Sequence, residues 1–315
     1  MRTSGEDWWS CHVGDDVAAQ PSPVARTIDL LGDRLTVAIL RDAFVDHIRR
    51  FSQWIERTGA PPAVLSSRLN TLVDAGLMER RPQEGAYDRH DYLLTDLGLA
   101  TWEFLVSVWT WQREWSADGL LQPELVHAGC GHRGPPELVC RVCGRRVGAR
   151  DVSLEVNADS LVVAARGSRR RSTRGAPALS RADLQFTVVM EAIGDRWSAL
   201  VTGFALSGVR RFSEFQSLLK VSPTTLTERL TRLCEVQVLR REEGGREYVL
   251  TPRGRALFPI FACQLAWTKV AHPDVPVEQL GPRLHHTACG SSLEPGLCCR
   301  GCGAILERTT VIFER

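Results

Sequence analysis

Histidine and cysteine residues recur in two short segments of the chain with the spacing of metal ligands. Each segment reads H-x2-C-G and then, after nine residues between cysteines, C-R-x-C-G. A tight turn presents two ligands this close to one ion, and the following glycine lets backbone amides face the thiolates. Two such turns supply three thiolates and one imidazole, the closed tetrahedral set of a structural zinc site. We therefore predict two structural Zn²⁺ sites. The predicted ligands are His127, Cys130, Cys140 and Cys143 in the first segment and His286, Cys289, Cys299 and Cys302 in the second.

Other interpretations of these segments stay open. The same pattern fits small hairpins with reduced, metal-free cysteines, or a redox switch, and His132, His285 and Cys298 are near enough to be alternative ligands. A closed set leaves no position for water, so we expect no catalytic zinc. Strands over 151–156 and 308–314 are expected to complete a small ribbon behind each site. Outside the predicted ligands, Cys234 is interpreted as packing and Cys11 as a candidate oxidant sensor.

The elements that position these ligands occur twice. The blocks IDLLGDRLTVAIL, RRFSQW, LSSRLNTLVDAGLMERR and YLLTDLGLA of the first half return as MEAIGDRWSALV, RRFSEF, LTERLTRLCEVQVLRRE and YVLTPRGRA. Their order is the same, and equivalent blocks lie about 160 residues apart, which indicates an internal duplication. Between the copies, a stretch rich in Ser, Gly, Ala and Arg that includes Arg169, Arg170 and Arg171 is interpreted as a linker that could also reach phosphates.

The second copy shows its plan most clearly. An apolar helix is expected over 184–206, and Ser213 with Gln216 predicts a capping box that opens a short helix. Ser222 and Pro223 then predict the start of the next helix. Its leucines at i, i+4 and i+7, namely Leu226, Leu230 and Leu233, form one buried stripe. Basic strands flank Gly244-Gly245 and favour a two-residue hairpin, and Thr251 opens a last helix over 252–270.

The first copy follows the same plan, with Leu65, Leu69 and Leu72 as the buried stripe and a longer basic hairpin over 80–94. Its last helix, over 96–116, is rich in tryptophan. We interpret this helix as a packing or dimerisation element, and a ligand cage is the alternative. The tryptophans concerned are Trp102, Trp109, Trp111 and Trp115.

Two short helices followed by a basic hairpin are typical of a winged helix-turn-helix. The joint pattern IGDRW, RRFSEF, SPTTLTERLTRL and YVLTPRGRALFP resembles the HxlR-type transcription regulators in both halves. The resemblance implies a winged helix whose first and last helices build a dimer, here within one chain. It places Ala63, Val64, Ser66, Ser67 and Arg68, and Thr224, Thr225, Thr227, Glu228 and Arg229, on the two DNA-reading helices. The predicted DNA-binding residues are Ser66, Ser67, Arg68, Thr71, Arg80, Arg81, Arg89, Thr224, Thr225, Thr227, Glu228, Arg229, Arg232, Arg240, Arg241 and Arg246.

The first copy departs from this pattern at the start of its reading helix. Pro61, Pro62, Ala63 and Val64 offer few polar atoms where bases would be contacted. The net charge of +2 is also low, so a DNA-binding surface has to be local. An interaction or ligand-sensing module with reduced DNA binding is therefore the alternative function. The segments show no nucleophile–base pair, phosphate loop or open metal site, so we expect no enzyme.

The predicted fold is mainly α with small β wings: two winged helix-turn-helix domains, each followed by a small zinc-ribbon-like β segment. The expected organisation is an extension 1–21, copy one 22–120, zinc-ribbon-like segment 121–157, linker 158–181, copy two 182–275 and zinc-ribbon-like segment 276–315. We predict a sequence-specific regulator of double-stranded DNA that acts as an intramolecular pseudo-dimer, open to a small-molecule effector and to homodimerisation. Repression is the expected direction, although no residue distinguishes it from activation. Without an apolar run long enough for a signal or membrane span, a cytoplasmic, nucleoid-associated protein is expected.

Overall fold

The computed structural model describes residues 22–82, 90–116, 122–156, 187–242 and 244–314. Within these ranges the chain is mainly helical with small antiparallel strand pairs, as predicted. Arg89, Cys11, the N-terminal extension and the expected linker, including Arg169, Arg170 and Arg171, lie outside the described residues.

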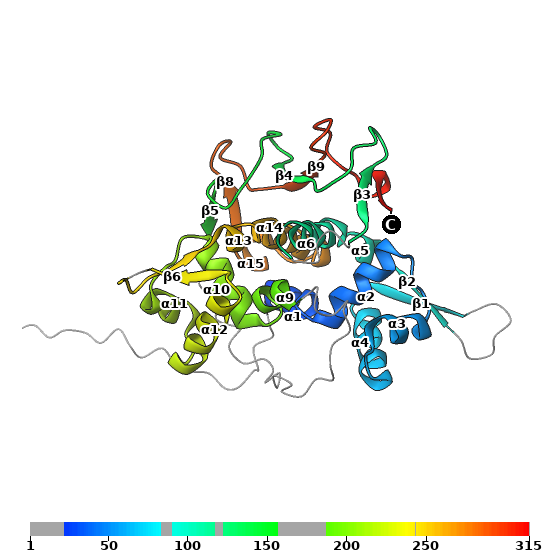
Figure 1. The fold of residues 1–315 in the computed structure, drawn as a ribbon, viewed down its shortest axis with the longest axis horizontal. Helices are drawn as coiled ribbons and strands as arrows, with labels where there is room; N and C mark the ends of the chain where they lie inside the picture. The colour runs from blue at the N-terminus through cyan, green and yellow to red at the C-terminus, as the bar shows by residue number, and fades with distance from the viewer. Residues whose placement is uncertain (1–21, 83–89, 117–121, 157–186, 243, 315) are drawn as a thin grey trace, which may run out of the picture.

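The two copies have the same succession of elements (Figure 1). The first comprises α1 (Pro23–Leu31), α2 (Arg34–Val45), α3 (Phe51–Thr58), α4 (Pro62–Asp74), β1 (Met78–Pro82), β2 (His90–Leu94), α5 (Asp96–Leu99) and α6 (Trp102–Trp115). The second comprises α9 (Thr187–Ile193), α10 (Arg196–Leu206), α11 (Phe212–Leu219), α12 (Pro223–Glu235), β6 (Leu239–Arg241), β7 (Tyr248–Leu250), α13 (Pro252–Arg255) and α14 (Phe258–Ala271), followed by α15 (Val277–Leu280).

The leucine stripes pack as predicted, because all six leucines of α4 and α12 are buried. The single helix expected over 184–206 is wrong. The chain breaks at Gly194 and restarts at Asp195, whose carboxylate accepts from the backbone amides of Trp197 at 3.0 Å and Ser198 at 3.2 Å. Such side-chain capping satisfies amides that have no partner in the first helical turn.

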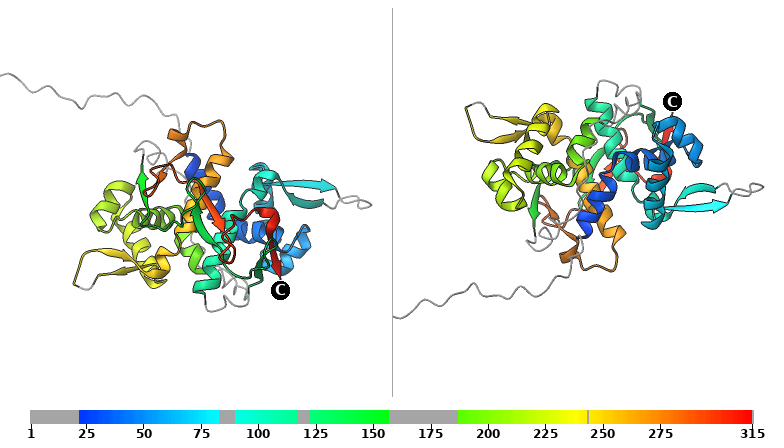
Figure 2. Two further views of the ribbon diagram at one scale, coloured as in Figure 1. Left: turned by 90° about the horizontal axis from the view of Figure 1, so that it is seen from above. Right: turned by 90° about the horizontal axis from the view of Figure 1, so that it is seen from below.

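The centre of the molecule is formed by α6 and α14, which lie against each other (Figures 1 and 2). The indole Nε1 of Trp111 in α6 donates to the Arg253 carbonyl at 3.1 Å, and that of Trp267 in α14 donates to the Leu97 carbonyl at 3.2 Å. Trp111 and Trp267 hold the same position in their helices, as Leu97 and Arg253 do in α5 and α13. The contact is therefore reciprocal, as in an isologous dimer interface.

The segments after α6 and α14 cross between the copies. Strand β3 (Glu124–His127) pairs with β10 (Val311–Glu314), β4 (Glu137–Cys140) with β9 (Pro295–Cys298), and β5 (Val152–Glu155) with β8 (Arg283–His286), all antiparallel. The expectation that each copy completes its own ribbon is wrong, because every one of these strands takes its partner from the other copy. We call residues 122–156 and 281–314 the tail layer.

Figure 1 shows how these parts are arranged. The helices α4 and α12 lie at the lower edge of the molecule, the hairpins β1–β2 and β6–β7 extend to its two sides, and the tail layer covers the opposite face of α6 and α14. No helix among the described residues is both long and apolar enough to span a membrane.

Candidate nucleic-acid interface and metal sites

The outer faces of α4 and α12 carry the polar side chains expected there. Ser66 and Ser67 are exposed on α4, and Thr224, Thr227 and Glu228 are exposed on α12. Helix α12 begins as predicted, because the Ser222 hydroxyl accepts from the Thr225 amide at 3.2 Å. Hydroxyl and carboxylate groups on a helix of this kind can contact base edges in a major groove.

In each of the two helices, one residue that was predicted to contact DNA forms an ion pair within its own domain. The Arg68 guanidinium pairs with the Asp33 carboxylate, with 2.9 Å between Nε and Oδ1. The equivalent pair in the second copy joins Arg229 to Asp195, with 3.4 Å between Nε and Oδ1. Because Asp33 and Asp195 also cap α2 and α10, each aspartate ties the reading helix to the helix behind it. These arginines position the helices in this structure.

Three further predicted residues also have partners within the protein. The Thr71 hydroxyl donates to the Ser67 carbonyl at 3.0 Å, and the hydroxyls of Thr225 and Ser222 are 2.9 Å apart. Arg232 pairs with Glu191 at 2.7 Å and with Glu235 at 3.0 Å, and these hydrogen bonds raise the pKa of its guanidinium.

The wings carry exposed arginines on both sides of the molecule. On β1, Arg80 lies over the Tyr92 ring at 5.6 Å and hydrogen bonds to Asn70, and Arg81 pairs with Glu79 at 2.5 Å. In the second copy, the hairpin exposes Arg240, Arg241 and Arg246.

The predicted set omitted four arginines that the structure places beside α3 and α11. Arg49 and Arg50 precede α3, and Arg210 and Arg211 precede α11; all four are exposed. Tyr92 donates its amide to the Arg49 carbonyl and Tyr248 donates its amide to the Arg210 carbonyl, both at 2.8 Å, so each pair is fixed against its wing. The repeated RRFS motif was the signal in the sequence.

The eight predicted metal ligands meet in two groups of four. His127 and Cys130 lie with Cys299 and Cys302, and in each group every ligand atom lies within 4.8 Å of the others. The second group joins Cys140 and Cys143 to His286 and Cys289. The expected grouping within each copy is therefore wrong, because each group takes one ligand pair from either copy.

The distances within both groups suit a tetrahedral ion. In the first, His127 Nδ1 lies 3.2 Å from the Cys130 sulfur and 3.5 Å from the Cys302 sulfur, and the sulfurs of Cys130 and Cys299 are 3.6 Å apart. In the second, His286 Nδ1 lies 3.4 Å from the Cys143 sulfur and 3.3 Å from the Cys289 sulfur. Zinc bond lengths place tetrahedral ligand atoms about 3.5–3.8 Å apart.

The backbone around each ligand pair has the expected curl. The glycine after each pair has a positive φ of 70° to 74°, a conformation that side chains disfavour. These glycines are Gly131, Gly144, Gly290 and Gly303. The Ser291 amide lowers the pKa of Cys289 to about 6, and the Ala304 amide similarly lowers that of Cys302. Backbone donors thus favour the thiolate, the form that binds metal, at these two positions. At Cys130 and Cys143 a backbone amide acts in the same direction, but desolvation and the neighbouring sulfurs raise the pKa overall.

The alternative ligands lie outside both groups. The His285 ring contacts the Glu155 carboxylate at 2.7 Å, the His132 ring packs against Gly301, and burial raises the pKa of the Cys298 thiol. Among the described residues, the two groups therefore consist of the eight ligands that the spacing indicates.

A family model for the HxlR-like helix-turn-helix matches residues 30–119 and 192–274, which is more than half of the chain. The chain belongs to the HxlR family. The two matched stretches are the two copies, so this is an HxlR-family protein with a tandem duplication, as the resemblance implied.

Relatives of this HxlR-family chain include HTH-type transcriptional regulators. Those of Mycobacterium bovis and Mycobacterium tuberculosis are 39% identical over 137 residues, which is 42% of this chain and 84% of theirs. YvaP of Bacillus subtilis, also named an HTH-type transcriptional regulator, is 34% identical over 89 residues, 26% of this chain and 82% of its own.

Two solved structures resemble the chain over a share of its length similar to that matched by the mycobacterial relatives. A crystal structure described as a transcription factor has 30% identity, covers 46% of this chain and 93% of its own, and has a TM-score of 0.37. Another, from Pseudomonas aeruginosa, has 30% identity, covers 40% of this chain and 85% of its own, and has a TM-score of 0.30. The HTH-type regulators above match 42% and 26% of this chain over 84% and 82% of their own length, the coverage expected of relatives with a single copy.

The tryptophan-rich helix of this HxlR-family chain packs inside the molecule. Trp109 and Trp111 are 3% and 1% exposed, and Trp109 Nε1 donates to the Pro123 carbonyl at 3.1 Å. Trp115, at the end of the helix, is 36% exposed. The packing interpretation is thus confirmed for the two buried rings, whose polar atoms are paired within the protein.

Proposed function

We propose that this protein is a sequence-specific regulator of transcription that binds double-stranded DNA as an intramolecular pseudo-dimer. The observation that carries the proposal is the placement of α4 and α12 on one edge of the molecule, on either side of the reciprocal α6–α14 contact (Figure 1). Two reading helices related in this way enter successive major grooves about 34 Å apart in dimeric helix-turn-helix proteins. Here one chain would supply both helices, so no second chain is required.

Different side chains would contact the bases and the phosphate backbone of the DNA. Exposed Ser66, Ser67, Thr224, Thr227 and Glu228 are positioned for base edges, with Glu228 suited to accept from a cytosine amino group. The exposed arginines of the wings and of the RRFS motifs are positioned for phosphates, and they fix register without reading sequence.

The copies would read different half-sites. Helix α4 opens with exposed Pro62, Ala63 and Val64, where α12 has exposed Pro223 and Thr224 and half-buried Thr225. Apolar groups contact the thymine methyl, whereas hydroxyls exchange hydrogen bonds with several bases. We infer an imperfectly palindromic operator.

A footprint on genomic DNA fragments, followed by gel-shift titration of the protected site, tests the proposal. Replacing Arg240 and Arg241 by alanine should weaken binding to every sequence and reduce the slope of log affinity against log salt by about one for each phosphate that is no longer neutralised. Arg308→Ala, a matched arginine in the tail layer, should leave binding unchanged. If no fragment competes better than bulk DNA at physiological salt, the proposed function is wrong.

Repression is the direction we infer, because a protein that covers two adjacent major grooves within a promoter hinders polymerase access. In a reporter fused to the footprinted site, supplying the protein should lower expression, and a rise would reverse the assignment. Such a regulator would act in the cytoplasm, at the nucleoid.

The second candidate function is a protein-interaction module with reduced DNA binding. It is favoured by the apolar opening of α4, where Val64 is 49% exposed. Reversing the charge of the exposed wing arginines Arg240, Arg241 and Arg246 separates the candidates: a DNA regulator should lose its operator, whereas an interaction module should keep its activity in the cell.

We infer that each ligand group holds a structural Zn²⁺. Three thiolates and one imidazole nitrogen fill a tetrahedron, and no open position remains for water in such a set. The ion would supply charge that neutralises neighbouring thiolates, and because each group joins both copies, the metal would fasten one copy to the other. Atomic absorption of the purified protein tests the inference.

A further inference from the structure

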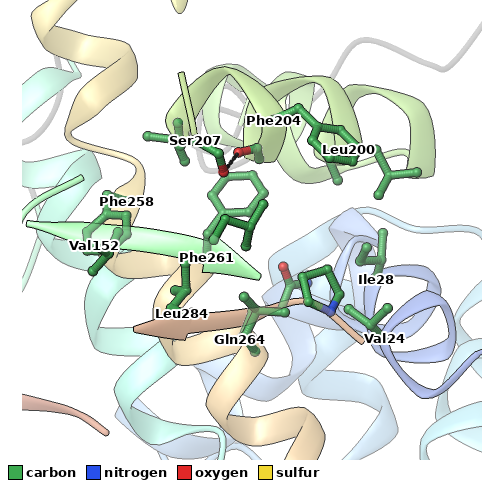
Figure 3. Close-up of a pocket in the computed structure, with 16 residues that line it drawn as sticks. Val24, Ile28, Val152, Leu200, Phe204, Ser207, Phe258, Phe261, Gln264 and Leu284 are labelled. Carbon is green, nitrogen blue, oxygen red and sulfur yellow. Dashed lines mark hydrogen bonds between the residues drawn. The ribbon is translucent and has the colours of Figure 1, made fainter. Parts of the chain in front are cut away.

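A mostly apolar cavity, partly open to solvent, lies between the copies beside α14 (Figure 3). Its walls come from α1 and β5 of the first copy and from α10, α14 and β8 of the second. Figure 3 shows Val24, Val152, Leu200, Phe261 and Leu284 around it. Concave sites with apolar walls and few polar groups commonly bind small molecules.

The equivalent place in the first copy contains aromatic rings. Phe44 of α2, Trp109 of α6 and Phe313 of β10 meet edge to face, with ring centroids 6.2 Å apart for Phe44 and Phe313 and 5.5 Å apart for Trp109 and Phe313. By position within equivalent elements, their counterparts are Leu206, Leu265 and Leu154. All three of these leucines line the cavity.

The cavity also contains a polar group that the first copy lacks. Gln264 is 2% exposed, lines the cavity, and its side-chain Nε2 has no hydrogen-bond partner among the described residues. Its counterpart in α6 is Val108. The Ser207 hydroxyl, by contrast, already donates to the Gly203 carbonyl at 3.0 Å. A buried amide without a partner costs free energy, which a ligand acceptor at that point would recover.

We propose that this cavity is the binding site of a small-molecule effector, an apolar ring compound that carries one hydrogen-bond acceptor for Gln264. The ring system would contact the leucines that replace the first copy's aromatic triad. Because the cavity wall includes α10, which packs against α12, a bound molecule would bias the placement of one reading helix relative to the other copy. That regulatory consequence rests on the proposed function, whereas binding itself does not.

Calorimetric titration of the full-length protein with two matched probes tests the site without DNA. 2-Acetylnaphthalene has a ring system and a carbonyl acceptor, and 2-isopropenylnaphthalene is a hydrocarbon of nearly the same shape, with a methylene group in place of the carbonyl oxygen. The native protein should bind the ketone up to about tenfold more tightly than the hydrocarbon, the range of one buried hydrogen bond. Failure of both probes to bind would overturn the proposal.

Two variants locate the binding. Leu154→Phe with Leu206→Phe and Leu265→Trp transfers the aromatic triad into the cavity and should weaken both probes by at least about tenfold. Gln264→Val should remove the preference for the ketone and preserve hydrocarbon binding. This single variant still tests the proposal if the triple variant does not fold. Unchanged affinities in a folded triple variant, or a retained ketone preference in Gln264→Val, would contradict the assignment.

Operator binding is then measured separately, with and without 2-acetylnaphthalene. A protein that binds the probe but no operator leaves the cavity assignment standing and removes the proposed function. A protein that binds its operator but neither probe removes the cavity assignment alone.

Discussion

Two equivalent aspartates connect local helix capping with the placement of the reading helices. Asp33 and Asp195 each accept from backbone amides at the start of α2 or α10 and pair with an arginine of α4 or α12. The Gly-Asp-Arg repeat was visible in the sequence, but the ion pairs join residues more than thirty positions apart. Local pattern therefore predicted the arginines as DNA contacts and could not indicate their partners.

Replacing Asp33 separates its two contributions. Asn is a good cap, so Asp33→Asn should keep helix α2 and lose only the ion pair with Arg68, whereas Asp33→Ala should lose the cap as well, at a cost of about 1 kcal/mol. Chemical denaturation measures both, with Asp74→Ala as an exposed control. Equal destabilisation by Asn and Ala would show that the cap contributes nothing.

Cys263 predicts a pH dependence of stability. It faces its counterpart Ser107 between α14 and α6, with 3.5 Å between Sγ and Oγ, and burial raises the pKa of the thiol from 9.0 to about 12. A raised thiol pKa means that folding favours the protonated form, so its contribution is complete below pH 9 and is lost as pH rises toward 12. Unfolding free energy should fall over that range, and less steeply in Cys263→Ala. An identical slope in the variant would exclude this thiol as the cause.

Helix starts show what short-range pattern can and cannot predict. Ser222 and Thr251 cap α12 and α13 as predicted. The single helix expected over 252–270 is wrong, because α13 ends at Arg255 and α14 begins at Phe258. The capping box at Ser213 and Gln216 is wrong: α11 starts at Phe212, and the Glu214 carboxylate accepts from the amides of Arg210 and Arg211, which lowers its pKa. Both capping patterns were present in the sequence. The pattern that formed is the one next to the tertiary contact between the RRFS segment and the wing.

At the scale of elements, the pairs of metal ligands show the same limit of prediction from short-range sequence pattern. Spacing predicted all eight residues of the two groups, because each pair is local to one turn. It could not predict which pairs share a group, because that depends on strands β4 and β9 pairing across the copies.

Double substitution of cysteines tests the crossed grouping. Cys130→Ser with Cys299→Ser removes two ligands from one group, so one of the two zinc ions should remain. Cys130→Ser with Cys140→Ser removes one ligand from each group, so both ions should bind more weakly. The opposite result, with the second variant retaining one tight ion, would show that each copy closes its own site. Zinc per chain, measured after mild chelation, distinguishes the outcomes.

At the scale of the whole molecule, the duplication has produced an interface with near-equivalent halves that differ in packing at one place. The Trp111 and Trp267 hydrogen bonds and the three crossed strand pairs are reciprocal. The cavity beside α14 is not, since three leucines stand where the first copy has aromatic rings. These differences can be seen when the sequences of the two halves are compared, but only the packing shows that the three positions meet.

Cutting the chain between the copies tests how far this interface holds the molecule together. With a protease site placed in the expected linker, the cleaved halves should co-elute as one species, because α6, α14 and the tail layer join them without the covalent connection. A chelator should promote their separation, since each metal site takes ligands from both halves and its binding free energy contributes to their association. Size-exclusion chromatography with light scattering measures this, and Trp111→Phe with Trp267→Phe should lower the chelator concentration needed. Halves that separate at once after cleavage, with zinc still present, would show that the crossed contacts are too weak to sustain a pseudo-dimer.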